Sequence, residues 1–217
     1  MTTNKLRKFY ILAIFIFQFL SSFAQINIAI THHGIDDGSA NLTKEDSLHI
    51  KTFQIEDFGK NMPSKNKSEI DFDLITVDQL KQICSKNKYT WLFIQSSWCG
   101  ACISNLNKNR KTVDSLKDEG ISIVVVTQDI LIKQLQKKIF MEKYNTLSYI
   151  IDPKKYGTNE SKKQEQFILE IAGNNKIENN PGSVPKNLFL NQKGELVYFD
   201  TTYKINTTLI KEKVLNK

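Results

Sequence analysis

Apolar residues in the second half of the chain fall into short continuous runs separated by stretches with a helical spacing. The runs are 90–94, 121–126 and 147–151, and apolar residues recur between them at Ile103, Leu106, Val113 and Leu116 and then at Leu131, Ile132, Leu135 and Ile139. A continuous apolar run is typical of a strand covered on both faces of a parallel sheet, and the helical spacing indicates one amphipathic helix ending near Gly120 and another over 129–144. This order predicts parallel strands joined by right-handed crossovers.

The C-terminal part predicts a hairpin followed by a closing helix. Two apolar runs within 182–199 flank a polar turn that contains Gly194. Pro185 opens the first run, where the missing N–H of proline is tolerated. Residues 205–215 carry apolar positions at helical spacing, which is typical of a helix packed on the sheet.

Before the first run, the pattern is weaker. Residues 26–30 and 48–55 alternate as half-buried strands do, and they predict a hairpin beside the main sheet. Thr76 is expected to cap a short helix over 77–84. Further on, 161–172 predicts a helix, and the charged stretch 160–165 on it is interpreted as a solvated face.

The N-terminal segment resembles a targeting signal. Three basic residues, Lys5, Arg7 and Lys8, precede an apolar stretch over 9–20, and small residues follow up to Ala24. This pattern predicts a secretory signal peptide over 1–24 that is cleaved after Ala24, and the alternative is an uncleaved anchor that holds the protein at a membrane. The expected organisation is a signal peptide (1–24), an N-terminal extension (25–70) and one main domain (71–217), working outside the cytoplasm in a periplasmic or secreted location.

Composition adds two exclusions. The chain has 217 residues, 40% of them hydrophobic, and a formal net charge of +7 that would fall to about +4 without the basic residues of the signal segment. The remaining charge is spread along the chain with no basic stripe interleaved with aromatic residues, so no nucleic-acid partner is expected. His32 and His33, with His49 and the nearby Asp36 or Asp37, are interpreted as polar turn residues because they lack a second pair at ligand spacing.

The candidate chemistry lies where the run 90–94 ends. Trp98-Cys99-Gly100-Ala101-Cys102 places two thiols where a helix is expected to begin. Unpaired N–H groups and the partial positive charge of a helix N-terminus stabilise a thiolate, here that of Cys99, while Cys102 would be shielded one turn further in. A haem attachment site would need a histidine after Cys102, and a zinc site would need a second ligand pair, so no metal or cofactor is expected. Cys84 is interpreted as a small core residue.

These residues resemble the active-site signature of the thioredoxin superfamily, and the extra helix and strand between 126 and 152 resemble its exported thiol-disulfide oxidoreductases. The resemblance implies a thioredoxin-like α/β fold, with a central mixed sheet flanked by helices, an extra helix-strand insertion and an N-terminal extension. It also implies a redox-active disulfide between Cys99 and Cys102, with Cys99 attacking a partner disulfide and Cys102 resolving the mixed disulfide. The implied partners are protein thiols or disulfides and an unidentified redox donor or acceptor.

The same resemblance assigns the residues around the cysteines. Trp98 would shield the site, and the N–H groups at Gly100 and Ala101 would stabilise the thiolate. Pro185 would be cis and face the cysteines, and Val184 and Pro185 would help to form the groove that takes the extended chain of a partner.

Two positions depart from the pattern of thioredoxin itself. Ala101 stands where thioredoxin has proline, and Phe93 stands where it has a buried acid that moves a proton to the inner cysteine. If Phe93 is buried, Cys102 must lose its proton to another group or to water. The alternative to an enzyme is a thioredoxin-like binding module with a static disulfide and no turnover.

Overall fold

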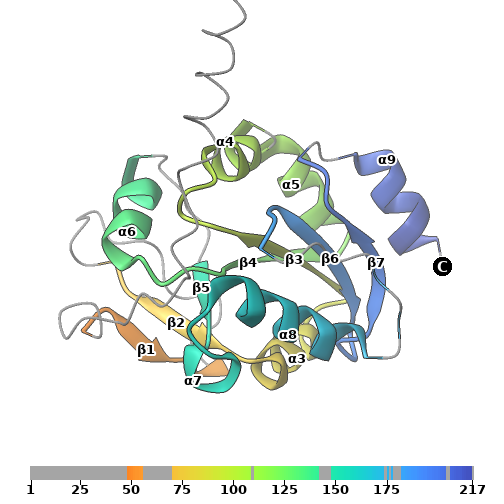
Figure 1. Cartoon of the computed structure of the whole chain (residues 1–217). Coiled ribbons are helices and arrows are strands. Elements are labelled where there is room, and N and C mark those ends of the chain that lie inside the picture. Colours follow the sequence, from red (N-terminus) through yellow and green to blue (C-terminus); the bar gives the residue numbers. More distant parts are fainter. Residues whose placement is uncertain are drawn as a thin grey trace, which may run out of the picture. The chain divides into compact units, whose positions relative to one another are not determined.

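One seven-stranded sheet in the order β1-β2-β5-β4-β3-β6-β7 organises the part of the chain that the structure describes (Figure 1). The computed structural model describes residues 48–55, 70–108, 110–141, 148–173, 175, 177, 182–203 and 206–216. The predictions for 1–24, for a strand over 26–30 and for His32, His33, Asp36 and Asp37 lie outside these residues.

The strands combine parallel and antiparallel pairing. They are β1 (Ile50–Thr52), β2 (Phe72–Ile75), β3 (Tyr89–Gln95), β4 (Ile121–Thr127), β5 (Ser148–Ile151), β6 (Lys186–Asn191) and β7 (Leu196–Asp200). Strand β3 pairs parallel with β4 and antiparallel with β6, and the hairpin β6–β7 completes that side of the sheet. The parallel pairs β1–β2, β2–β5 and β5–β4 form the other side. The predicted α/β fold with a central mixed sheet is confirmed.

Helices cover both faces of this sheet (Figure 1). They are α3 (Val77–Ser85), α4 (Gly100–Lys108), α5 (Arg110–Asp118), α6 (Ile132–Met141), α7 (Pro153–Tyr156), α8 (Glu160–Ala172) and α9 (Thr207–Ile210), which continues as a π-helical turn, Lys211–Leu215. Alternation along β3 divides the core, because Trp91 and Phe93 pack with α4, α5, α6 and α9, whereas Leu92 and Ile94 pack with α3 and α8.

Local sequence explains two of the element ends. The side chain of Thr76 accepts a hydrogen bond from the N–H of Gln79, and the Gln79 side chain accepts one from the N–H of Thr76, which is a capping box at the start of α3. Gly120, with φ of 84°, turns the chain after α5, and its carbonyl accepts a hydrogen bond from the N–H of Tyr89 at 3.2 Å. The turn therefore also sets β4 beside β3.

Several predicted elements differ in detail. The helix expected from Cys102 to Gly120 is two helices, α4 and α5, and β2 and α7 were not predicted. The helix expected over 129–144 spans Ile132–Met141, and residues 142–147 lie outside the described residues. The run 48–55 contributes β1, which pairs parallel with β2 at the side of the sheet.

The interpretation of 160–165 as a solvated face was wrong for its middle. Lys163 and Gln164 are both fully buried in α8, although Ser161 and Lys162 are exposed. The physical reason is that Lys163 and Gln164 lie on the side of α8 that carries Phe167 and Ile168, and that side faces the sheet.

Within the described residues, no helix has the length and apolar character needed to cross a membrane.

Candidate functional site

The two cysteines of the motif lie at the carboxyl end of β3, where the chain turns into α4. Cys99 and Cys102 are joined by a disulfide with a Cα–Cα distance of 5.4 Å. Cys102 is fully buried, whereas Cys99 keeps 5% of its surface exposed. Of the two cysteines, Cys99 is therefore the one that keeps residue surface in contact with solvent.

The first turn of α4 directs its backbone toward the Cys99 sulfur. The N–H of Cys102 donates a hydrogen bond to Cys99 Sγ at 3.2 Å. The same N–H also donates to the carbonyl oxygen of Cys99 at 3.2 Å, so the backbone and the sulfur of Cys99 share this first-turn donor. A negative charge formed on Cys99 by reduction would therefore meet a donor and the positive end of the α4 dipole.

The residues next to the cysteines form an exposed rim. Gly100 and Ala101 are exposed, and Trp98 has 57% of its surface exposed. A Cβ added at Gly100 would meet no heavy atom within 4 Å, which indicates open space beside the motif. Trp98 is thus an exposed aromatic side chain immediately before the accessible cysteine.

The segment before β6 reaches the same hydrophobic cluster as the two cysteines. Val184 belongs to the hydrophobic cluster that contains Cys99 and Cys102, and the Val184–Pro185 peptide bond is cis. The cis conformation expected for Pro185 is therefore confirmed. The hydroxyl of Tyr203 donates a hydrogen bond to the carbonyl oxygen of Val184 at 2.9 Å, so the loop after β7 also reaches this segment.

Phe93 is buried in the cluster that contains both cysteines. It therefore places an aromatic ring, with no ionisable group, in the same cluster as the disulfide. Because Phe93 is buried and cannot accept a proton, Cys102 would have to lose its proton to another group or to water.

A layer of buried polar side chains follows the ends of β3 and β4. It contains Gln95, Ser96, Ser97, Thr127, Gln128 and Asp129. Asp129 Oδ2 accepts a hydrogen bond from the N–H of Ser97 at 2.5 Å, two residues before Cys99. Burial raises the pKa of Asp129, although the hydrogen bonds from Ser97 and the charge of Lys163 act in the opposite direction.

Two charged residues of α8 extend this layer. Burial and the charge of Asp129 raise the pKa of Glu160, against the opposing effects of Lys163 and a hydrogen bond with the Trp98 side chain. Burial lowers the pKa of Lys163 to about 8, although Glu160, Asp129 and Asp152 act to raise it. Sequence reasoning missed Asp129, Glu160 and Lys163, and the one available signal was that Asp129 follows the apolar run 121–126, whose end should lie beside that of β3.

The other candidate residues within the described part of the chain are Cys84 and His49, which belong to a core cluster and to a polar pair. Cys84 is a free, fully buried cysteine in the cluster beneath α3 and α8, as expected of a core residue. His49 Nδ1 lies 3.3 Å from Asp71 Oδ1. Among the residues that the structure describes, no three His, Cys, Asp or Glu side chains are grouped as a metal would require.

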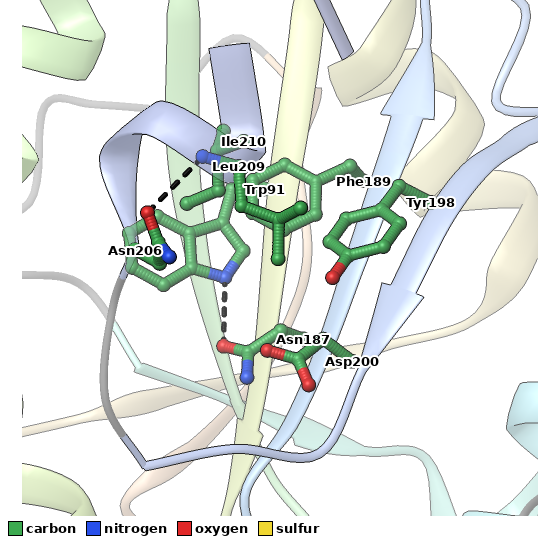
Figure 2. Close-up of a pocket in the computed structure, with 8 residues that line it drawn as sticks. All are labelled: Trp91, Asn187, Phe189, Tyr198, Asp200, Asn206, Leu209 and Ile210. Carbon is green, nitrogen blue, oxygen red and sulfur yellow. Dashed lines mark hydrogen bonds between the residues drawn. The ribbon is translucent and has the colours of Figure 1, made fainter. Parts of the chain in front are cut away.

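A small cavity lies between the hairpin β6–β7 and α9 (Figure 2). Its volume is about 10 Å³, and it is lined by Trp91, Asn187, Phe189, Tyr198, Asp200, Asn206, Leu209 and Ile210. The indole N–H of Trp91 donates to Asn187 Oδ1 at 3.1 Å, and the N–H of Leu209 donates to Asn206 Oδ1 (Figure 2). Such a volume holds about one water molecule, so the cavity does not bind a larger ligand in this conformation.

No family model and no curated protein matches the sequence. Solved structures with a similar fold include a thiol:disulfide interchange protein from Bacteroides sp., at 15% identity and a TM-score of 0.44, covering 60% of this chain and 76% of that one. The thioredoxin domain of a thiol-disulfide oxidoreductase from Bacteroides vulgatus is 18% identical with a TM-score of 0.42, covering 59% and 81%. A thiol:disulfide interchange protein of the thioredoxin family from Chlorobium tepidum is 11% identical with a TM-score of 0.44, covering 62% and 82%. Likeness at this level does not bear on the chemistry of the site.

Proposed function

We propose that this protein is an exported thiol-disulfide oxidoreductase that exchanges disulfides with other proteins through Cys99 and Cys102. The observation that carries the proposal is the unequal placement of the two sulfurs. Cys99 keeps some exposed surface and accepts a hydrogen bond from the N–H of Cys102, while Cys102 is enclosed within reach of Cys99. In a pair arranged in this way, one sulfur can form the mixed disulfide with the partner and the other can break it to release the partner.

The reaction proceeds by two thiol-disulfide exchanges. In the reduced protein, the Cys99 thiolate attacks a partner disulfide, a bond forms between Cys99 and one partner sulfur, and the other partner sulfur leaves as a thiolate. The Cys102 thiolate then attacks Cys99, the mixed disulfide breaks, and the second partner sulfur leaves. Two electrons pass to the partner, which is reduced, and the Cys99–Cys102 disulfide forms; the reverse sequence oxidises a partner dithiol.

The surrounding residues have separate roles in this proposal. Trp98 shields the exposed side of Cys99, and the first turn at Gly100 and Ala101 stabilises the thiolate. Val184 and Pro185 form the wall against which an extended segment of the partner lies. The sulfur chemistry transfers electrons directly, so the proposal includes no cofactor and no metal.

Export is the second part of the proposal. The basic and apolar residues of 1–24 support a cleaved secretory signal, with the protein acting in the periplasm or as a secreted protein. If the segment is not cleaved, the domain acts at a membrane, on its extracytoplasmic side. Its partners are then exported proteins with thiols or disulfides, and a redox donor or acceptor of the same compartment.

The direct test is reduction of insulin disulfides by dithiothreitol in the presence of the protein lacking residues 1–24. The wild-type protein should accelerate the reaction, and the double variant Cys99→Ala/Cys102→Ala should not. The matched control is Cys84→Ala, which removes the remaining cysteine and should leave the acceleration unchanged. Equal activity of the wild-type protein and the double variant would refute the proposed enzyme.

The second candidate function is a binding module in which the disulfide is a static link. It is favoured by the low exposure of Cys99. A redox titration against glutathione separates the two functions. A potential near or above about −250 mV indicates a working couple, whereas a potential well below about −300 mV indicates a structural disulfide.

A further inference from the structure

Lys163 is a buried cation close to the redox motif, on the helix α8 that packs against the sheet. Its residue surface is fully buried, and its Nζ atom has no hydrogen-bond partner among the described residues. An ammonium in such a position is unfavourable unless opposite charges compensate it. Burial of Lys163 therefore requires negatively charged groups close to its ammonium.

Three carboxylates supply that compensation, each from a different segment. Lys163 interacts electrostatically with Glu160 on its own helix, with Asp129 after β4, and with Asp152 before α7. The other buried lysine near this layer, Lys186 at the start of β6, donates instead to Ser183 Oγ at 2.7 Å. Lys163 is thus the cation that Asp129 and Glu160 share.

Two of these carboxylates, Asp129 and Glu160, hold the backbone and the side chain that precede Cys99. Asp129 Oδ2 accepts the N–H of Ser97 at 2.5 Å. Glu160 is hydrogen-bonded to the side chain of Trp98. Ser97 and Trp98 lead directly into Cys99, so the charge of this group lies behind the turn that presents the reactive sulfur.

We propose that Lys163 is a positioning residue of the redox site, which offsets the charges of Asp129 and Glu160 behind the Ser97–Trp98 turn and so favours the thiolate of Cys99. This inference rests on the proposed function and deepens it, because it names the group that sets the charge around the disulfide. Lys163 acts through the electrostatic field and does not touch the sulfur. Phe93, in the same cluster as the cysteines, provides no charge of its own.

The sign of each effect follows from the charges. Loss of the Lys163 ammonium leaves the carboxylates uncompensated, which disfavours a negative sulfur and raises the pKa of Cys99. Loss of the Glu160 carboxylate removes negative charge and lowers the pKa of Cys99. A merely structural role would disturb the turn in both variants, without this opposition of sign.

The test uses Lys163→Met, Glu160→Gln and the double variant, each as the reduced protein without residues 1–24. Alkylation of Cys99 by iodoacetamide, followed across pH by mass spectrometry with fragmentation between Cys99 and Cys102, gives the pKa of Cys99 without contributions from Cys84 and Cys102. Lys163→Met should raise this pKa by about half a unit and Glu160→Gln should lower it by about as much. Well below the pKa, each shift changes the alkylation rate about threefold.

The double variant removes one charge of each sign, so its Cys99 pKa should return close to that of the wild-type protein. The matched control is Lys162→Met, which removes the same charge from the neighbouring exposed position of α8 and should leave the pKa in place. If Lys163→Met does not fold, Glu160→Gln and the double variant still decide the outcome.

Shifts of the same sign in Lys163→Met and Glu160→Gln would overturn the proposal. Absence of a shift in Glu160→Gln, or a shift in Lys162→Met as large as in Lys163→Met, would do the same. The alkylation rate of Cys99 is measured without any partner, so it reports on Lys163 whether or not insulin is reduced. Failure of the proposed function would instead leave the insulin reaction unaccelerated.

Discussion

Cys84 and Cys99 are both buried cysteines, yet they stand at opposite ends of their helices. Cys84 lies in the last turn of α3, where the N–H of Asn87 donates to its carbonyl at 3.0 Å. Cys99 stands just before α4, and its sulfur accepts the N–H of Cys102. The end of a helix where carbonyls are unpaired disfavours a thiolate, and the end where amides are unpaired stabilises one.

The surroundings of the two sulfurs increase this difference. Burial raises the pKa of the Cys84 thiol, against the weaker opposing effect of a hydrogen bond with Thr90. Cys99 retains exposed surface and lies beside the exposed residues Trp98 and Gly100. Low exposure alone therefore does not distinguish a core cysteine from a reactive one, and the position relative to helix ends decides.

The strongest test of this difference is Cys99→Ser. Acceleration of insulin reduction should disappear completely, because the hydroxyl of serine is not a nucleophile toward disulfides at neutral pH. The insulin assay measures the loss. Retained activity in Cys99→Ser would mean that Cys84 or Cys102 can attack a partner, and the contrast between the cysteines would then be wrong.

Cys102→Ser should separate attack from release. Cys99 can still form the mixed disulfide, but no inner thiolate can resolve it, so a covalent complex should accumulate. Non-reducing electrophoresis after incubation with an oxidised protein partner detects the complex. Cys99→Ser/Cys102→Ser is the matched control, and a complex that forms in this variant would have to come from Cys84.

Cys84→Ala should affect stability and leave exchange unchanged. Removal of a buried side-chain atom from the cluster beneath α3 and α8 leaves a small cavity, and we expect a loss of about 1 kcal/mol in the free energy of unfolding. Urea unfolding in the Cys99→Ser/Cys102→Ser background measures this loss without reshuffling of disulfides. A change in insulin reduction by Cys84→Ala alone would contradict the assignment of Cys84 to the core.

The smallest expected effect is a pH dependence due to Cys84. Because its folded pKa is raised, the thiol contributes stability that is fully present below the unfolded pKa of about 8.5 and is lost as the pH rises through the folded pKa. In the Cys99→Ser/Cys102→Ser background, the free energy of unfolding should therefore fall more steeply above that pH than it does when Cys84→Ala is added. Parallel pH profiles of the two proteins would show that Cys84 is not held protonated by burial.

Sequence reasoning succeeded where a short segment decides its own structure. The run before Cys99, the helix capped by Thr76 and the hairpin after Pro185 all carry local signals of periodicity, capping or turn formation, and each is present. The break between α4 and α5 was not predicted, because the apolar spacing continues across it. The strand β2 was missed because its few residues show no clear periodicity.

For the candidate site, local sequence signals predicted the two cysteines, but the charged residues around them were recognised only from the fold. Lys163 lies in a charged stretch whose composition is typical of a solvated segment. It is buried only because α8 packs on the sheet. Asp129 and Glu160 are separated from Cys99 by tens of residues in sequence, and no periodicity connects them. Burial of a charged side chain depends on which distant residues pack over it, and the local sequence pattern does not contain this information.

By itself, the sequence determined that two thiols stand at the junction of a strand and a helix, because strand periodicity and the Cys-x-x-Cys spacing are properties of consecutive residues. Tertiary structure alone decided which charges surround them, because β4, α8 and the segment before β6 come together around β3 only through long-range pairing and packing. Reactivity of a sulfur depends on the sum of these fields, so it is set in space and not along the chain.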